Sequence, residues 1–99
     1  MEPKQKIRLK KKGKVLINGA IGAEMLDLST EGMYIYTNAD FIPESIINLS
    51  FSLGAKRLNI YAKVRHMEPG IGIGVKFIDI DKDAAETIKN YIDKIREGR

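Results

Sequence analysis

The sequence predicts a mainly β domain, a six-stranded antiparallel barrel with one C-terminal amphipathic α-helix. Three observations predict this class. Apolar and polar residues alternate in several short segments, as they do in strands with one buried face. The breaks between these segments are short and carry no helical pattern, which favours a closed antiparallel barrel, because closure leaves no exposed edges. After Ile80 the apolar residues follow a helical period instead.

The first half of the chain contains three predicted strands. They cover residues 15–18, 23–29 and 33–37, with a turn at 19–22 between the first two. The third is favoured by tyrosine and isoleucine, which are common in extended backbone.

The second predicted strand ends in an acidic and a hydroxyl residue two positions apart, Asp27 and Ser29. Alternation predicts that these two share one face, while Leu26 and Leu28 point into the core. Gly32 follows, and we expect it to let the chain turn sharply through a positive φ.

The second half contains the clearest alternation. Predicted strands cover residues 47–53, 58–65 and 71–77, separated by a hairpin turn at 54–56 and a break at 68–70. A connection at 38–44 that contains Pro43 precedes them.

The last element is a predicted helix over residues 83–97. Asp83 is its expected N-cap, with Glu86 three positions later in a capping-box spacing. Five residues form one apolar face, namely Ala84, Ile88, Tyr91, Ile92 and Ile95. We expect this face to pack on the barrel rather than on a partner.

Composition limits the possible functions. The 99 residues are 43% hydrophobic, enough for one domain with its own core, and they include no cysteine. Disulfides, thiolate zinc sites and cysteine nucleophiles are therefore excluded. The N-terminus lacks the apolar core of a signal peptide, and no apolar run reaches membrane-spanning length, so we expect a cytoplasmic protein.

The positive charge is concentrated at one end of the chain. The first 14 residues carry seven basic groups and one acidic group, a net charge of +6, whereas the remaining 85 carry a net charge of −2. We interpret residues 1–13 as a flexible basic arm that binds an anion, and residues 14–99 as one barrel domain. A solvated, self-repelling tail is the alternative for the arm.

The sequence does not predict an enzyme or a metal site. The single histidine, His66, is expected at the surface or rim, and the serines lack a nucleophile elbow. Three alternate acids, Asp79, Asp81 and Asp83, are better explained as favouring the dipole at a helix start than as calcium ligands. The glycines within 70–74 lack the lysine and helix of a phosphate-binding loop.

With these features together, the chain resembles the PilZ domain family, the receptors for cyclic di-GMP. Asp27-x-Ser29-x-x-Gly32 matches the family's D-x-S-x-x-G motif, and the segment 74–77 is similar to the G-V-x-F strand before its C-terminal helix. The resemblance extends over nearly the whole chain. It implies a bacterial second-messenger receptor that acts in signalling, with a PilZ-like barrel.

The family's other signature, R-x-x-x-R, is altered here. Its preferred placement is on Lys4 and Arg8, so that lysine replaces the first arginine. A competing placement on Arg8 and Lys12 leaves less chain before the strand at Val15. Lysine can hold a phosphate but cannot form the two-pronged contact of a guanidinium with guanine.

The resemblance implies a ligand site made of Lys4, Arg8, Asp27, Ser29 and Gly32, with Lys12 as a further phosphate contact. Cyclic di-GMP is the implied ligand and no cofactor is expected. The function predicted is a receptor or adaptor whose partner-binding surface changes when the basic arm closes on the nucleotide.

Two alternatives remain open at this point. One is a PilZ-like protein-interaction module that no longer binds nucleotide. The other is a small basic barrel that binds RNA or single-stranded DNA, in which Tyr34, Tyr36 and Tyr61 stack on bases, although they match no RNA-recognition signature. The downstream partner, the ligand stoichiometry and the choice between monomer and homodimer are not predicted.

Overall fold

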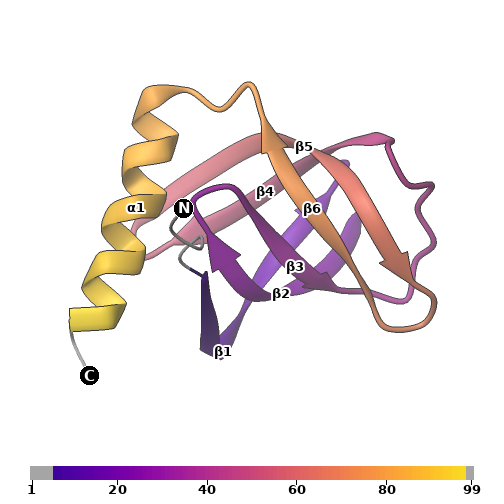
Figure 1. The fold of residues 1–99 in the computed structure, drawn as a ribbon, viewed down its shortest axis with the longest axis horizontal. Coiled ribbons are helices and arrows are strands. Elements are labelled where there is room, and N and C mark those ends of the chain that lie inside the picture. Colours follow the sequence, from indigo (N-terminus) through magenta and orange to yellow (C-terminus); the bar gives the residue numbers. More distant parts are fainter. Residues whose placement is uncertain (1–5, 98–99) are drawn as a thin grey trace, which may run out of the picture.

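The structure is a computed structural model that describes residues 6–97, and for Lys6 and residues 8–12 it describes the backbone alone. Six antiparallel strands form a closed barrel in the order β1-β2-β3-β6-β5-β4, followed by one helix, α1 (Figure 1). The strands are β1 (Lys6–Ile17), β2 (Ile21–Ser29), β3 (Gly32–Tyr36), β4 (Ile46–Leu53), β5 (Lys56–Glu68) and β6 (Gly72–Ile78). The predicted fold class is confirmed.

The barrel closes where β1 pairs with β4, with Val15 opposite Phe51. Alternation in β4 is almost complete, and its inward residues Ile47, Leu49, Phe51 and Leu53 are all buried. The rings of Phe51 and Phe77 stack inside the barrel with their centroids 6.5 Å apart. The period-two pattern in the sequence thus corresponds directly to one buried face of each strand.

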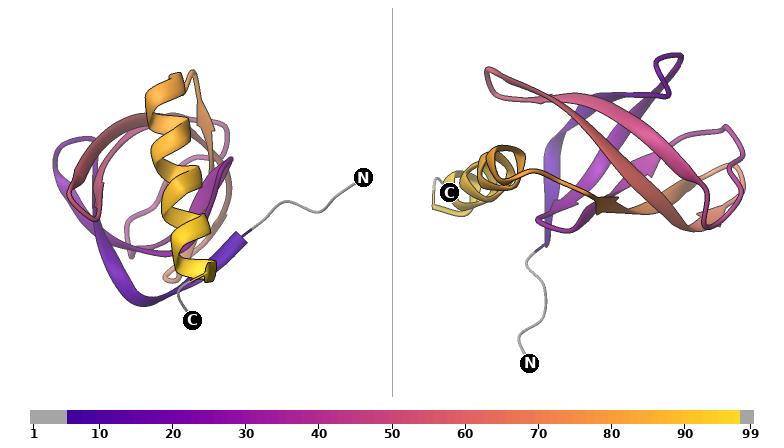
Figure 2. Two further views of the ribbon diagram at one scale, coloured as in Figure 1. Left: turned by 90° about the vertical axis from the view of Figure 1, so that its left-hand side faces the viewer. Right: turned by 90° about the horizontal axis from the view of Figure 1, so that it is seen from above.

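The helix α1 (Lys82–Glu97) begins one residue before the predicted start. Its N-cap is Asp81 and not Asp83, because the Asp81 carboxylate accepts a hydrogen bond of 2.8 Å from the backbone N–H of Ala84. The helix lies across one end of the barrel (Figure 2), and Ile88 and Ile92 are buried there. The expectation that its apolar face packs on the barrel is confirmed.

β1 begins at Lys6, well before the strand predicted at Val15. The predicted arm, residues 1–13, therefore overlaps this strand by residues 6–13. The register of β1 against β2 shifts between Arg8 and Gly13, so that several residues of β1 face a single residue of β2. This irregularity separates the basic first half of β1 from its apolar second half.

A β-bulge at Leu26 corrects the face predicted for that residue. Met25 lies opposite Ile35 of β3 and Asp27 lies opposite Tyr34, which leaves Leu26 as the extra residue. The bulge turns both Met25 and Leu28 into the core, whereas Leu26 is half-buried and outside it. No helix within residues 6–97 is long and apolar enough to span a membrane.

Candidate functional site

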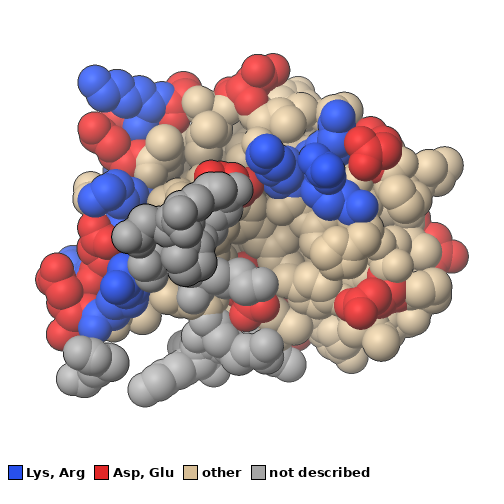
Figure 3. Space-filling view, viewed as in Figure 1, with Lys and Arg blue, Asp and Glu red and all other residues tan. Residues whose placement is uncertain are grey.

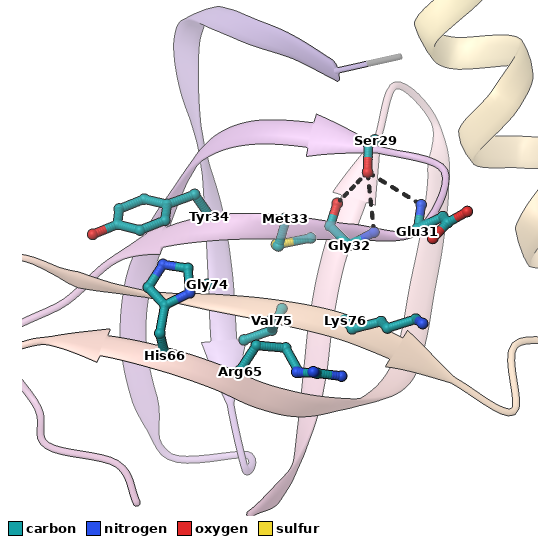
Figure 4. A pocket seen from close by; sticks show the side chains of 10 residues that line it. All are labelled: Ser29, Glu31, Gly32, Met33, Tyr34, Arg65, His66, Gly74, Val75 and Lys76. Atoms are coloured by element: carbon teal, nitrogen blue, oxygen red, sulfur yellow. Dashed lines mark hydrogen bonds between the residues drawn. The ribbon is translucent and has the colours of Figure 1, made fainter. Parts of the chain in front are cut away.

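Ser29 organises the tight turn that joins β2 to β3. Its hydroxyl oxygen accepts hydrogen bonds of 3.2 Å from the backbone N–H groups of Glu31 and Gly32, and it donates one of 3.3 Å to the Gly32 carbonyl (Figure 4). The side chain is buried and fully engaged with its own turn. Ser29 thus holds the shape of the corner between the two strands.

Gly32 is required by a close approach of backbone, not by the positive φ that was expected. Among the described glycines, positive φ occurs at Gly19, Gly54 and Gly70, and Gly32 is not one of them. A Cβ atom at Gly32 would collide with the backbone carbonyl oxygen of Val75 in β6. The glycine therefore lets β6 lie against the turn, a position where any side chain would have to displace backbone.

Asp27 lies at the centre of a row of residues that crosses five strands. Its direct partners in the register are Arg8 of β1 and Tyr34 of β3, and Tyr34 is in turn opposite Gly74 of β6, which is opposite His66 of β5. Directly opposed residues on neighbouring strands share a face, and adjacent strands are about 4.8 Å apart. Asp27 is 9% exposed, as is Ser29, and the predicted shared face of these two residues is present in the barrel.

The structure describes the predicted basic residues only in part. Arg8 lies opposite Asp27 and Lys6 lies opposite Ser29, so the start of β1 runs along the D-x-S-x-x-G motif. Lys12 lies within β1, in the irregular segment after Arg8. Lys4 lies outside the described residues.

A pocket of about 260 Å³ opens on the outer face of β3, β5 and β6 beside this motif (Figure 4). Ser29 and Gly32 line it, whereas Asp27 does not. Figure 4 shows two unlike ends, with the rings of Tyr34 and His66 at one end. The side chains of Arg65 and Lys76 extend toward the other end, where the carboxylate of Glu31 also lies. This arrangement combines aromatic and apolar surface with a few charged groups, as is usual for small-molecule sites.

At the aromatic end, a hydrogen bond fixes one of the two rings. The Tyr34 hydroxyl donates to the carboxylate of Glu68 in β5, and the centroids of the Tyr34 and His66 rings are 6.2 Å apart with a tilt of 35°. The hydrogen bond to Glu68 is the main cause that raises the pKa of Tyr34 to about 12, with desolvation and the negative charge of Asp27 adding to it. Tyr34 is therefore a neutral hydrogen-bond donor at physiological pH.

At the basic end, two cations share one acid and a third has none. Glu44 pairs with Lys63 at 3.6 Å and with Arg65 at 3.9 Å. Lys76 lies directly opposite Lys63 in the register, and no ion pair within residues 6–97 involves it. Figure 3 shows basic side chains gathered over β5 and β6, and the arrangement favours an anion there.

Sequence reasoning missed two residues that line this pocket, Arg65 and Lys76. It placed His66 only at the surface or rim, and it named Tyr34 only for the nucleic-acid alternative. These four residues come from three strands and share no local spacing. One signal was present, since Gly72 and Gly74 alternate on the outward face of β6 and leave room above it. No group of three or more His, Cys, Asp or Glu side chains within the described part of the chain is arranged to hold a metal ion.

Comparison with known sequences gives one family. The sequence model of the PilZ domain matches residues 2–94. No curated protein matches the chain.

Three solved structures share the fold. The inhibitor of motility MotI/DgrA of Bacillus subtilis superposes with a TM-score of 0.82 at 14% identity, over 100% of this chain and 53% of that protein. An uncharacterized protein of Legionella gives 0.68 at 14% identity, over 96% of this chain and 97% of its own. PlzA of Borreliella burgdorferi, solved in complex with cyclic di-GMP, gives 0.63 at 21% identity, over 93% of this chain and 41% of that protein. The chain thus spans about half of the Bacillus protein, and the three superpositions show a shared fold.

Proposed function

This chain belongs to the PilZ domain family, and from that premise we propose that it is a receptor for cyclic di-GMP that acts as a regulatory adaptor and not as an enzyme. The observation that carries the proposal is the register of β1 against β2. It sets Arg8 opposite Asp27 and Lys6 opposite Ser29, so basic residues run beside the family motif. The cyclic di-GMP complex of PlzA, which has a similar barrel, supports the same ligand class.

Each motif residue has a separate task in this proposal. Asp27 accepts hydrogen bonds from the N1–H and N2–H₂ edge of a guanine, and Arg8 binds the paired O6 and N7 acceptors of a guanine or a phosphate. Ser29 and Gly32 hold the corner and keep β6 close, so that the ligand meets a rigid surface.

The lysine at position 4 weakens the site without removing it. Replacement of one bidentate arginine contact by a point charge costs about 1–3 kcal/mol, which is roughly a tenfold to a hundredfold loss of affinity. The other basic residues of the first 14, Lys12 among them, offset part of this loss through the two negative charges of the ligand. This compensation decreases with salt, because exposed charges are screened.

We propose that ligand binding changes the surface that a partner protein contacts. The basic N-terminal segment closes on the nucleotide against the face that carries Asp27, and the ordering of this segment changes that surface. Unchanged NMR line widths and protease sensitivity of that segment at saturating cyclic di-GMP would contradict it.

Isothermal titration calorimetry with cyclic di-GMP, at low and at physiological salt, tests the receptor function. The variants are Arg8→Ala and Asp27→Ala, with Arg57→Ala and Asp40→Ala as matched controls, since both control residues are exposed and lie outside the motif and the pocket. Saturable binding that is lost in the first pair and retained in the second supports the proposal. No heat from the folded, unsubstituted protein at either salt rejects it.

A second candidate is a protein-interaction module that no longer binds nucleotide. The observation that favours it is the Ser29 hydroxyl, whose hydrogen bonds all remain within its own turn. Absence of binding in the calorimetry, with an intact fold, would support this candidate.

A further inference from the structure

Two aromatic rings lie over the glycines of β6 on the outer face of the barrel. A Cβ atom at Gly74 would be 2.5 Å from Cε1 and 2.9 Å from Nε2 of the His66 ring. A Cβ atom at Gly72 would collide with the backbone carbonyl oxygen of Ile35, and it would also be 2.9 Å from Cε2 and 3.1 Å from Cζ of the Tyr34 ring. The missing side chains of β6 thus make room for two rings to lie close against the sheet.

The Tyr34 ring is held in place by a hydrogen bond, and the His66 ring lies against it with one side accessible. Glu68 anchors the Tyr34 hydroxyl, and His66 contacts Tyr34 ring to ring. His66 is exposed and Tyr34 is half-buried, and both line the pocket beside the family motif. We call these two residues the aromatic shelf.

The aromatic shelf lies next to Asp27, which is proposed to accept hydrogen bonds from the guanine base. Tyr34 is the direct cross-strand partner of Asp27, and the Asp27 charge contributes to the raised pKa of Tyr34. A purine that lies flat on a ring has its hydrogen-bonding edge directed sideways along the sheet, toward a neighbouring strand. One strand spacing is about 4.8 Å, so one base can meet both groups.

Two cations, Arg65 and Lys76, and one acid, Glu31, lie toward the other end of the same pocket. Lys76 of β6 is two residues from Gly74 on the same face, and Arg65 lies at a bulge of β5 beside His66. Figure 4 shows both cationic side chains directed away from the aromatic shelf, and Lys76 has no ion-pair partner within the described chain.

We propose that Tyr34 and His66 stack on a purine base of the bound nucleotide and that Lys76 binds its phosphate. The inference rests on the proposed function and adds contacts outside the family motif. Stacking on an aromatic side chain strengthens binding about fivefold to a hundredfold per base, enough to offset the missing arginine contact. The barrel wall then supplies affinity that the altered signature lacks.

Affinity for cyclic di-GMP in four variants tests the aromatic shelf. We expect His66→Ala and Tyr34→Leu to weaken binding about fivefold to a hundredfold. Tyr34→Phe keeps the ring and should remain close to the unsubstituted protein. Tyr61→Leu removes an exposed tyrosine outside the pocket and serves as the control. In the complex, NOEs from the His66 ring to guanine H8 report the contact directly.

The outcomes separate this inference from the proposed function. Binding that is lost in Asp27→Ala but unchanged in His66→Ala, without the NOEs, overturns the aromatic shelf alone. No binding by the unsubstituted protein overturns the proposed function and this inference with it. If Tyr34→Leu does not fold, His66→Ala decides, because its exposed side chain is outside the core.

The phosphate contact is tested by the salt dependence of binding. Lys76→Gln should weaken binding about twofold to fivefold at low salt and less at high salt. Lys56→Gln, at the exposed β4–β5 turn, is the control. Equal affinities and equal salt dependences for the two variants would remove Lys76 from the site.

Discussion

The hydroxyl of Tyr34 in β3 donates a hydrogen bond to the carboxylate of Glu68 in β5, across the intervening strand β6. The bond is possible because glycine occupies the positions of β6 that lie beneath it, Gly72 and Gly74. This hydrogen bond thus links β3 to β5 over β6 and fixes the Tyr34 ring on the outside of the barrel.

This bond predicts a specific dependence of stability on pH. Because the pKa of Tyr34 is raised from 10.0 to about 12, the fold favours the neutral phenol. The contribution of this hydrogen bond to the free energy of unfolding is fully present below pH 10 and is lost as the pH rises through about 12. We expect the unfolding free energies of the unsubstituted protein and Tyr34→Phe to converge across this window. Urea unfolding at several pH values measures it, and a constant difference would contradict the raised pKa.

Substitution of Gly32 should destabilise the barrel strongly. The Cβ of Gly32→Ala meets the carbonyl oxygen of Val75, which is backbone in β6 and cannot move aside cheaply. We expect a loss of about 1–3 kcal/mol or more in the free energy of unfolding. Gly22→Ala in β2 is the matched control, since nothing lies within 4 Å of its added Cβ. Equal stabilities of the two variants in urea would disprove the close approach.

Substitution of Gly74 should affect binding more than stability. The Cβ of Gly74→Ala meets the exposed ring of His66, which can swing away into solvent. We expect the free energy of unfolding to change by about 0.5 kcal/mol or less. The affinity for cyclic di-GMP should fall as it does in His66→Ala. Thermal unfolding and calorimetry on the same sample separate the two effects. Undiminished affinity would mean that the position of the ring over Gly74 is not needed for binding.

The start of α1 gives a prediction about its cap. Asp81→Ala removes the acceptor for the Ala84 N–H and should cost about 1 kcal/mol. Asp83→Ala, two residues later, should cost less, because only its charge near the helix N-terminus is lost. Chemical denaturation compares the two directly, and a larger loss for Asp83→Ala would restore the cap predicted from the sequence.

Much of the fold was predictable because its signals are local. Most strands were recognised from alternation over a few residues, and β3 was recognised from its tyrosine and isoleucine residues. The helix α1 was recognised from its period and terminal residues, to within one residue of its start. The D-x-S-x-x-G segment was recognisable for the same reason, since it lies within one strand and one turn.

The failures were at irregularities that alternation does not encode. The bulge at Leu26 changes which apolar residues of β2 face inward, and the long start of β1 lies in a lysine-rich segment without a strand pattern. Gly32 was recognised as necessary but for the wrong reason, because the atom it must avoid belongs to β6, which lies more than 40 residues later in the chain.

Local sequence patterns were therefore enough to predict the number, type and order of the elements, the closed barrel and the position of the family motif. Which side chains meet on the barrel wall depends on how the strands pair. Tyr34, His66, Glu68 and Gly74 come together from three strands through their hydrogen-bonded register. A side-chain period of two records which face a residue occupies, but register depends on pairing between distant segments, which local sequence does not specify.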